Sequence, residues 1–178
     1  IGIQNVDIRF DPNTAGSFVL ATRDNSNNHS FAAACTLSGT TITFGTNVQV
    51  STHINGDNIR LDFDPNNAGK IILAYSDGAT SNSGTVSGTS LSLGTPVVFR
   101  SSSAYYLHVR FDKNTNGKFI VIYGMGNNGY LRVGTISGTT ASFGSSVYVY
   151  NTAASNRSFI DFHPTSLGKF VVTYRDEQ

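Results

Sequence analysis

The stretch Phe63–Lys70 reads Phe-Asp-Pro-Asn-Asn-Ala-Gly-Lys, and an apolar run, Ile71–Ala74, follows it directly. Asp before Pro favours a type I turn, because the carboxylate accepts hydrogen bonds from following amides and Pro presets φ near about −65°. A closing glycine supplies a positive φ without steric cost. The stretch therefore predicts a β-hairpin whose second strand is covered on both faces.

Copies of this phrase divide the chain of 178 residues into repeats. The closing glycines are Gly16, Gly69, Gly117 and Gly168. A second phrase, Ser-Gly with another glycine six residues after the first, occurs in the three complete repeats at Ser38–Gly45, Ser87–Gly94 and Ser137–Gly144. We place the repeats at about 1–53, 54–102, 103–153 and a partial 154–178, within a single domain of residues 1–178. The chain is expected to be a segment of a longer or processed protein, since it does not begin with Met.

Each full repeat reads as four short strands. The first alternates in polarity, as in Val6–Phe10 and Leu107–Phe111, which is typical of a half-buried strand. The second is the apolar run. The third is expected at 32–37, 84–86 and 131–136, and the fourth at 41–50, 90–99 and 140–150. No window shows helical periodicity, so we predict an all-β fold with essentially no helix.

Four antiparallel strands in each repeat of about fifty residues are typical of a β-propeller blade. The sequence predicts a β-propeller-like array of four-stranded antiparallel blades, with three full blades and half of a fourth. A β-sandwich or an open β-solenoid built from the same hairpins is the alternative. In either case neighbouring repeats must bury each other's apolar faces, because one blade does not bury both of its own.

Charged residues occupy equivalent positions in the predicted first strands. The residue before the repeat Phe alternates in sign from copy to copy, and a second position, polar in the first three copies, lies two residues earlier. One interpretation is a set of solvated strand faces, where an ion pair is worth about 0–1 kcal/mol. The other is a charge ladder that sets the register of the blades and lines a narrow channel. The residues are Arg9, Asp62, Arg110 and Asp161, preceded by Asp7, Arg60, His108 and Phe159.

Composition excludes several classes of function. The net charge is +1 and only 13% of residues are charged, so no strong field attracts nucleic acid or anionic lipid. No apolar run reaches the roughly 18–20 residues of a membrane-spanning helix, so no membrane insertion is expected. The single cysteine, Cys35, excludes an internal disulfide framework and a cysteine zinc site, and its apolar context predicts a buried thiol.

Sequence motifs for catalysis or metal binding are weak. Asp112–Gly117 matches the first half of a calcium loop, but Tyr123 stands where the ligand Glu is expected, so turn capping is favoured. The four histidines lack ligand spacing, and His163 is predicted to be a turn residue. We therefore expect no enzyme activity, no cofactor and no metal. A sialidase-like hydrolase would need arginines and carboxylates converging on a channel.

Three tyrosines at one repeat position, Tyr75, Tyr123 and Tyr174, are the candidate ligand-binding residues. A repeated aromatic residue stacks on sugar rings in lectin propellers, and it equally packs one blade on the next. Packing is the favoured interpretation, because the chain has no Trp, the residue with the largest stacking surface.

The repeated phrases also resemble a known kind of protein. Phe63–Lys70, Gly84–Thr89 and Leu93–Pro96, with their counterparts in the third repeat, look like the repeat arrays of tail-fibre and other structural proteins of marine bacteriophages. They resemble more loosely the first hairpin of YVTN- and WD40-like propellers. Lys113 in place of Pro and His163 in place of Asp depart from this resemblance. The resemblance implies a structural role and no catalytic activity.

The sequence therefore predicts a non-enzymatic structural or adhesive repeat module, extracellular or on the surface of a virion. Its partners are expected to be other subunits or the rest of its own chain, and not nucleic acid. A glycan-binding, lectin-like propeller with surface glycans as ligands is the alternative. The loops expected to present a binding surface are 25–30, 51–57, 78–83, 100–105, 126–129 and 151–157.

Overall fold

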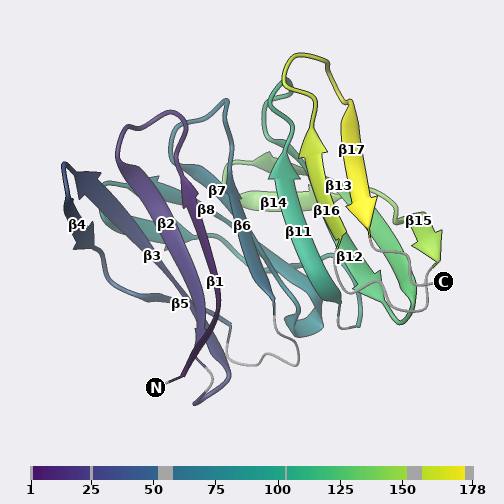
Figure 1. Ribbon diagram of the computed structural model, residues 1–178, viewed down its shortest axis with the longest axis horizontal. Helices are drawn as coiled ribbons and strands as arrows, with labels where there is room; N and C mark the ends of the chain where they lie inside the picture. The colour runs from purple at the N-terminus through teal and green to yellow at the C-terminus, as the bar shows by residue number, and fades with distance from the viewer. Residues whose placement is uncertain (1, 25, 52–57, 103, 152–157, 175–178) are drawn as a thin grey trace.

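Strands that follow one another in the chain pair antiparallel and build three similar sheets and a final hairpin (Figure 1). The computed structural model describes residues 2–24, 26–51, 58–102, 104–151 and 158–174. Within these ranges the only helical element is a short 3-10 turn, η1 (Asp77–Ala79). The prediction of an all-β fold built from repeated four-stranded antiparallel sheets is confirmed.

The first repeat shows the plan of each sheet. Its strands pair in the order β1-β2-β3-β4, and β5 also pairs with β3. The turn predicted from the Asp-Pro phrase joins β1 to β2 and places Phe10 opposite Phe18. The strands are β1 (Ile3–Phe10), β2 (Ser17–Asp24), β3 (His29–Ser38), β4 (Thr41–Phe44) and β5 (Val48–Ser51).

The later repeats follow the same plan, and the last has two strands within the described residues. The second contains β6 (Ile59–Phe63), β7 (Lys70–Tyr75), β8 (Thr80–Ser87), β9 (Ser90–Leu93) and β10 (Val97–Val98). The third contains β11 (Tyr105–Phe111), β12 (Lys118–Met125), β13 (Asn128–Ser137), β14 (Thr140–Phe143) and β15 (Val147–Asn151). The fourth contains β16 (Ser158–Phe162) and β17 (Phe170–Tyr174).

The fourth strand of each full repeat differs from the prediction, because it is broken into two short strands. In the first repeat β4 and β5 pair with opposite ends of β3. The break follows Gly45, where the main chain lies against the next repeat. A Cβ atom built on Gly45 would lie only 1.9 Å from the carbonyl oxygen of Thr89. The close approach of the next repeat thus accompanies a break that alternation of side chains alone does not predict.

The three largest apolar cores lie between repeats, and a small fourth cluster around Phe18 and Cys35 lies within the first repeat. The core between the first two contains β2 and β3 residues of the first repeat, such as Val19 and Ala34, with Leu61, Phe63 and Ile71 of the second. The next two junctions have equivalent cores. At about 1.5–3 kcal/mol for each fully buried Val, Leu, Ile or Phe, these junctions supply most of the hydrophobic stabilisation of the array.

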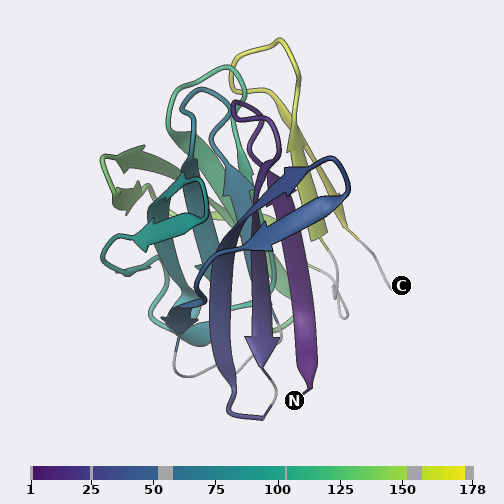
Figure 2. The same ribbon diagram turned by 90° about the vertical axis from the view of Figure 1, so that its left-hand side faces the viewer.

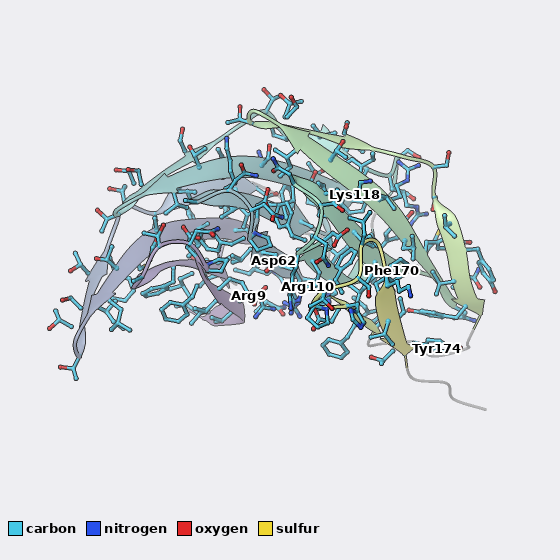
Figure 3. All side chains as sticks on the ribbon, turned by 90° about the horizontal axis from the view of Figure 1, so that it is seen from above. Arg9, Asp62, Arg110, Lys118, Phe170 and Tyr174 are labelled. Atoms are coloured by element: carbon cyan, nitrogen blue, oxygen red, sulfur yellow. The ribbon has the colours of Figure 1, made fainter. Side chains whose placement is uncertain are left out.

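The sheets form an open arc and not a closed ring. Figure 3 shows the arc from above, with Arg9, Asp62 and Arg110 gathered on its concave side. The first strands, β1, β6, β11 and β16, stand side by side in Figure 1, and contacts link each to the next. Figure 2 looks at the end of the arc formed by the first repeat. The described residues therefore support a propeller-like arrangement of repeats without a closed propeller.

One predicted surface loop is wrong. Residues 78–83 lie mainly in β8, where Ser81, Asn82 and Ser83 are buried. The turn between β7 and β8 consists mainly of η1. Tyr75 Oη donates a 2.7 Å hydrogen bond to Asn82 Oδ1, and this bond helps to hold β8 against β7. Of the other expected loops, residues 25, 52–57, 103 and 152–157 lie outside the described ranges.

Candidate functional site

Four charged side chains, one from each first strand, line a single cavity on the concave side of the arc. The cavity has a volume of about 390 Å³. We call Arg9, Asp62, Arg110 and Asp161 the central charge cluster. Because residues of a strand alternate between its faces, the apolar neighbours of Asp62, Arg110 and Asp161 point into the junction cores. The neighbours of Arg9, Ile8 and Phe10, are instead exposed at the end of the arc. The four positions are those whose charges alternate in the sequence.

Acceptor side chains of the first strands also bind the main chain of the next repeat. At each junction one such acceptor receives a hydrogen bond from an amide of the neighbouring first strand. Bonds to charged acceptors are among the stronger ones in proteins. The amides of Leu61, Phe111 and Ile160 donate respectively to Asp7 Oδ2 at 3.0 Å, Asp62 Oδ2 at 2.8 Å and His108 Nδ1 at 3.2 Å.

Hydrogen bonds from main-chain amides to side-chain acceptors thus link the first strands, and they take the place of the ladder of opposite charges predicted from the sequence. Among the residues with described positions, the one ion pair is that between Arg9 and Asp7, 3.5 Å apart within a single strand. Each arginine instead turns back on its own strand. Arg60 and Arg110 donate 2.9 Å hydrogen bonds to the carbonyl oxygens of Ile59 and Val109. The junctions are therefore registered by amides and not by pairs of opposite charges.

Burial changes the titration of this cluster. It raises the pKa of Asp62 to about 6, although the Phe111 amide and the charge of Arg110 act in the opposite direction. Burial likewise lowers the pKa of Arg110 below its ordinary value. Near neutral pH the Asp62 carboxylate is still ionised, and it can keep its charge-assisted bond to the next repeat.

His108 is held neutral by its surroundings. Burial, followed by the charges of Arg110, Arg9 and Arg60, lowers its pKa to about 3. Since Nδ1 accepts the bond from Ile160, the neutral ring carries its proton on Nε2. Sequence reasoning missed this role, because His108 is not part of any ligand spacing. The signal that pointed to it is its alignment with Asp7, another acceptor at the same repeat position.

A second ladder lies at the hairpin turns. Asp11 Oδ2 accepts a 2.8 Å bond from the amide of Gly69 in the next repeat, and Asp64 Oδ2 accepts one of 3.1 Å from Gly117. Their other oxygens, Oδ1, cap the turn within the same repeat, as the Asp-Pro phrase predicts. Each turn carboxylate therefore shapes its own hairpin and ties it to the following one.

The third turn has the same construction, and it explains the partial calcium motif. Burial raises the pKa of Asp112, but bonds from Thr115, Asn114 and Gly168 outweigh this effect and leave the pKa below its ordinary value. In the fourth turn His163 Nδ1 accepts bonds from Thr165 and Ser166, which agrees with its predicted turn role. Within the described ranges no three His, Cys, Asp or Glu residues form a group suited to a metal ion.

The three candidate tyrosines do not form a common surface. Tyr75 and Tyr123 are buried in junction cores, at 3% and 2% exposure, so their ring faces are covered by protein. Tyr174 is 47% exposed and stacks on Tyr150 with ring centroids 4.4 Å apart. Tyr174 lies in the last repeat, which no described repeat follows, whereas the equivalent residues of the second and third repeats are covered.

The predicted cysteine environment agrees with the structure. The Cys35 thiol is fully buried, and burial raises its pKa, which disfavours the reactive thiolate. No helix in the described ranges is long and apolar enough to cross a membrane. Comparison with family models and with curated proteins gives no match for this chain.

Proposed function

We propose that this chain is a non-enzymatic structural or adhesive repeat module of a virion appendage or a cell surface. The observation that carries the proposal is the pair of hydrogen-bond ladders that tie each repeat to the next. They engage the carboxylates of Asp7, Asp11, Asp62, Asp64 and Asp112. Acidic groups engaged in this way stabilise a scaffold, whereas general acid–base catalysis requires a carboxyl group free to reach a substrate.

The resemblance of the repeats to structural arrays of marine bacteriophages supports the same proposal. A rigid stack of sheets suits a module that must survive outside a cell, because cutting by proteases requires local opening of the chain. Its partners would be other subunits or further repeats of the same kind. An extracellular or virion-surface location belongs to this proposal.

The location is tested directly by immunogold electron microscopy with an antibody raised against the purified chain. We expect labelling on the outside of virions or cells in the material from which the sequence derives. Labelling confined to the cell interior would overturn the proposal.

As a second arm, the pure protein should resist thermolysin, and Asp64→Ala should be cut at least about tenfold faster, in line with the loss of a buried charge-assisted network. Asp24→Ala is the control, because among the described residues the Asp24 side chain bonds only to Ser26, two residues further along.

Glycan binding is the second candidate function, and the central cavity favours it. Arg9, Asp62 and Arg110 offer hydrogen-bonding groups next to the rings of Phe10 and Phe111, a combination that suits a sugar with its polar edge and apolar face. A glycan array probed with the purified protein should then give saturable binding, competed by free sugar and lost in Arg110→Ala. The absence of saturable binding would leave the structural proposal as the better one.

A further inference from the structure

Within the described residues, two apolar surfaces at the ends of the arc are not covered by another repeat. The N-terminal face is formed by Val6, Ile8 and Phe10 of β1, which are 53%, 46% and 53% exposed. Equivalent residues in every later repeat are covered by the repeat before them. Thus Leu61 and Phe63, in the positions of Ile8 and Phe10, are 0% and 3% exposed.

The C-terminal face is the complementary surface at the other end. It is formed by Val171 and Thr173 of β17, with Phe159 and Asp161 of β16; Val171 is 60% exposed. The residues in the position of Val171 in earlier repeats are Val19, Ile72 and Ile120, each at most 2% exposed. They are covered by the first strand of the repeat that follows. The C-terminal face therefore has the composition of a surface that receives a first strand.

The hydrogen bonds between first strands indicate which kind of first strand the C-terminal face would receive. The acceptors at successive junctions alternate between two positions of the first strand. Asp7 and His108 lie three residues before the repeat Phe, whereas Asp62 lies one residue before it. Continued alternation requires an acceptor one residue before Phe in the fourth repeat. Asp161 stands at that place.

Asp161 is also available for such a bond. Its Oδ1 accepts a 2.9 Å bond from the amide of Phe162, and among the described residues Oδ2 has no hydrogen-bond partner. In the equivalent residue, Asp62, Oδ2 binds the amide of Phe111 in the next repeat. The first strand that would follow thus needs Arg before its Phe, as in the third repeat. Arg9 and Phe10 provide that pair at the open N-terminal face.

We propose that the C-terminal face of one molecule docks on the N-terminal face of a second copy of this chain. Phe10 of the second copy takes the place of Phe111 at this junction, and its amide donates to Oδ2 of Asp161. The contact is head-to-tail, so each molecule uses two different surfaces. It names the partner for the structural role proposed above and rests on that role.

The junction between copies is weaker than those within the chain. His163 replaces the turn Asp and uses Nδ1 inside its own turn, so the bond that Asp64 accepts from the Gly117 amide has no counterpart here. In the described residues, the hairpin β16–β17 also brings two strands to the contact, where earlier repeats bring five. Association is therefore expected to depend on concentration.

Complementation of two face variants tests the proposal. Ile8→Glu blocks the N-terminal face and Val171→Glu blocks the C-terminal face, while each leaves the opposite face intact. By analytical ultracentrifugation, the unchanged protein should associate as its concentration rises, and each variant alone should stay monomeric. An equimolar mixture of the two variants should form a dimer, because one intact face of each kind remains. Asp161→Ala should weaken association by about tenfold, as expected for losing a charge-assisted bond.

Val98→Glu is the matched control, since Val98 is 59% exposed but lies on β10 of an internal repeat. It should associate as the unchanged protein does. A protein that stays monomeric at every concentration would overturn the proposal, and so would loss of association in only one variant or a mixture that stays monomeric. Thermal unfolding of each variant, measured in parallel, reports on the scaffold itself, so the docking proposal can fail while the structural role stands.

Discussion

At the scale of single residues, this protein uses acidic and imidazole side chains as acceptors for the main chain of a neighbouring repeat. Asp7, Asp62 and His108 do this on the inner strands. An edge strand exposes amides that invite pairing with any other strand. A side-chain acceptor at a fixed position satisfies one of these amides and also selects one register, which a purely apolar contact does not do.

The depressed pKa of His108 leads to a prediction about acid stability. A histidine ordinarily titrates near about 6.5, and in the folded protein its pKa is about 3. Its contribution to the free energy of unfolding is therefore complete above pH of about 6.5 and is lost progressively as the pH falls toward the folded value. His108→Asn keeps an acceptor but does not titrate. In this variant the unfolding free energy should fall less steeply between neutral and acidic pH, and the difference in slope should correspond to at most one bound proton.

Urea unfolding at a series of pH values measures this difference. Asp62 acts in the opposite direction, because its raised pKa adds stability as the pH falls from about 6. The comparison must therefore be the difference between His108→Asn and the unchanged protein, in which the contribution of Asp62 cancels. Parallel pH profiles for the two proteins would refute the assignment.

At the scale of elements, the broken fourth strand is set by contact with the next repeat. Gly45 and Gly94 follow β4 and β9, and their α-carbons face the carbonyl oxygens of Thr89 and Thr139. Neither glycine has a positive φ, so the need for glycine here comes from space and not from backbone conformation. The third repeat keeps a glycine at this position, Gly144, although no following repeat approaches it in the described residues.

This difference predicts unequal effects of one substitution. In Gly94→Ala the new Cβ would lie 2.1 Å from the carbonyl oxygen of Thr139, so the two repeats must separate. We expect a loss of about 1–3 kcal/mol of unfolding free energy, the range for overpacked sites. Gly144→Ala is the matched control, because its nearest neighbour is Val133 O at 3.7 Å, and it should change stability by less than about 0.5 kcal/mol. Equal losses in chemical denaturation would contradict the role of the junction.

At the scale of the whole molecule, most buried apolar contacts lie between repeats, and within the described residues the outer faces of the two end repeats lack them. Every junction core combines the second strand of one repeat with the first strand of the next. The end repeats therefore expose residues that are fully covered elsewhere. This one-dimensional organisation makes the position of a residue along the array as important as its type.

Two equivalent residues test this directly. Leu61→Ala removes a side chain that is 0% exposed, and it should cost about 2–5 kcal/mol. Ile8→Ala changes the same repeat position in the first repeat, where the side chain is 46% exposed, and it should cost less than about 1 kcal/mol. Denaturation of dilute protein, below the range of self-association, gives both values. A cost at Ile8 as large as that at Leu61 would show that the first repeat is covered in solution.

The sequence by itself determined the local and periodic features of this protein. The Asp-Pro turns, the apolar second strands and the absence of long helices follow from the local rules of turn chemistry and strand alternation. The same local pattern occurs in each repeat, which strengthens the prediction. The burial of Cys35 and the turn role of His163 follow from their local context in the same way. Those rules depend only on residues close together in the chain.

Only the tertiary structure decided how one repeat meets the next. Spacing in the sequence does not show that Asp62 reaches the amide of Phe111, or that Gly45 lies against Thr89, because these contacts join residues more than forty positions apart. The split of the fourth strand and the open ends of the arc depend on the same long-range packing. Local preferences determine the structure of each repeat. The angle and spacing between repeats depend on side chains that pack together only in the assembled array.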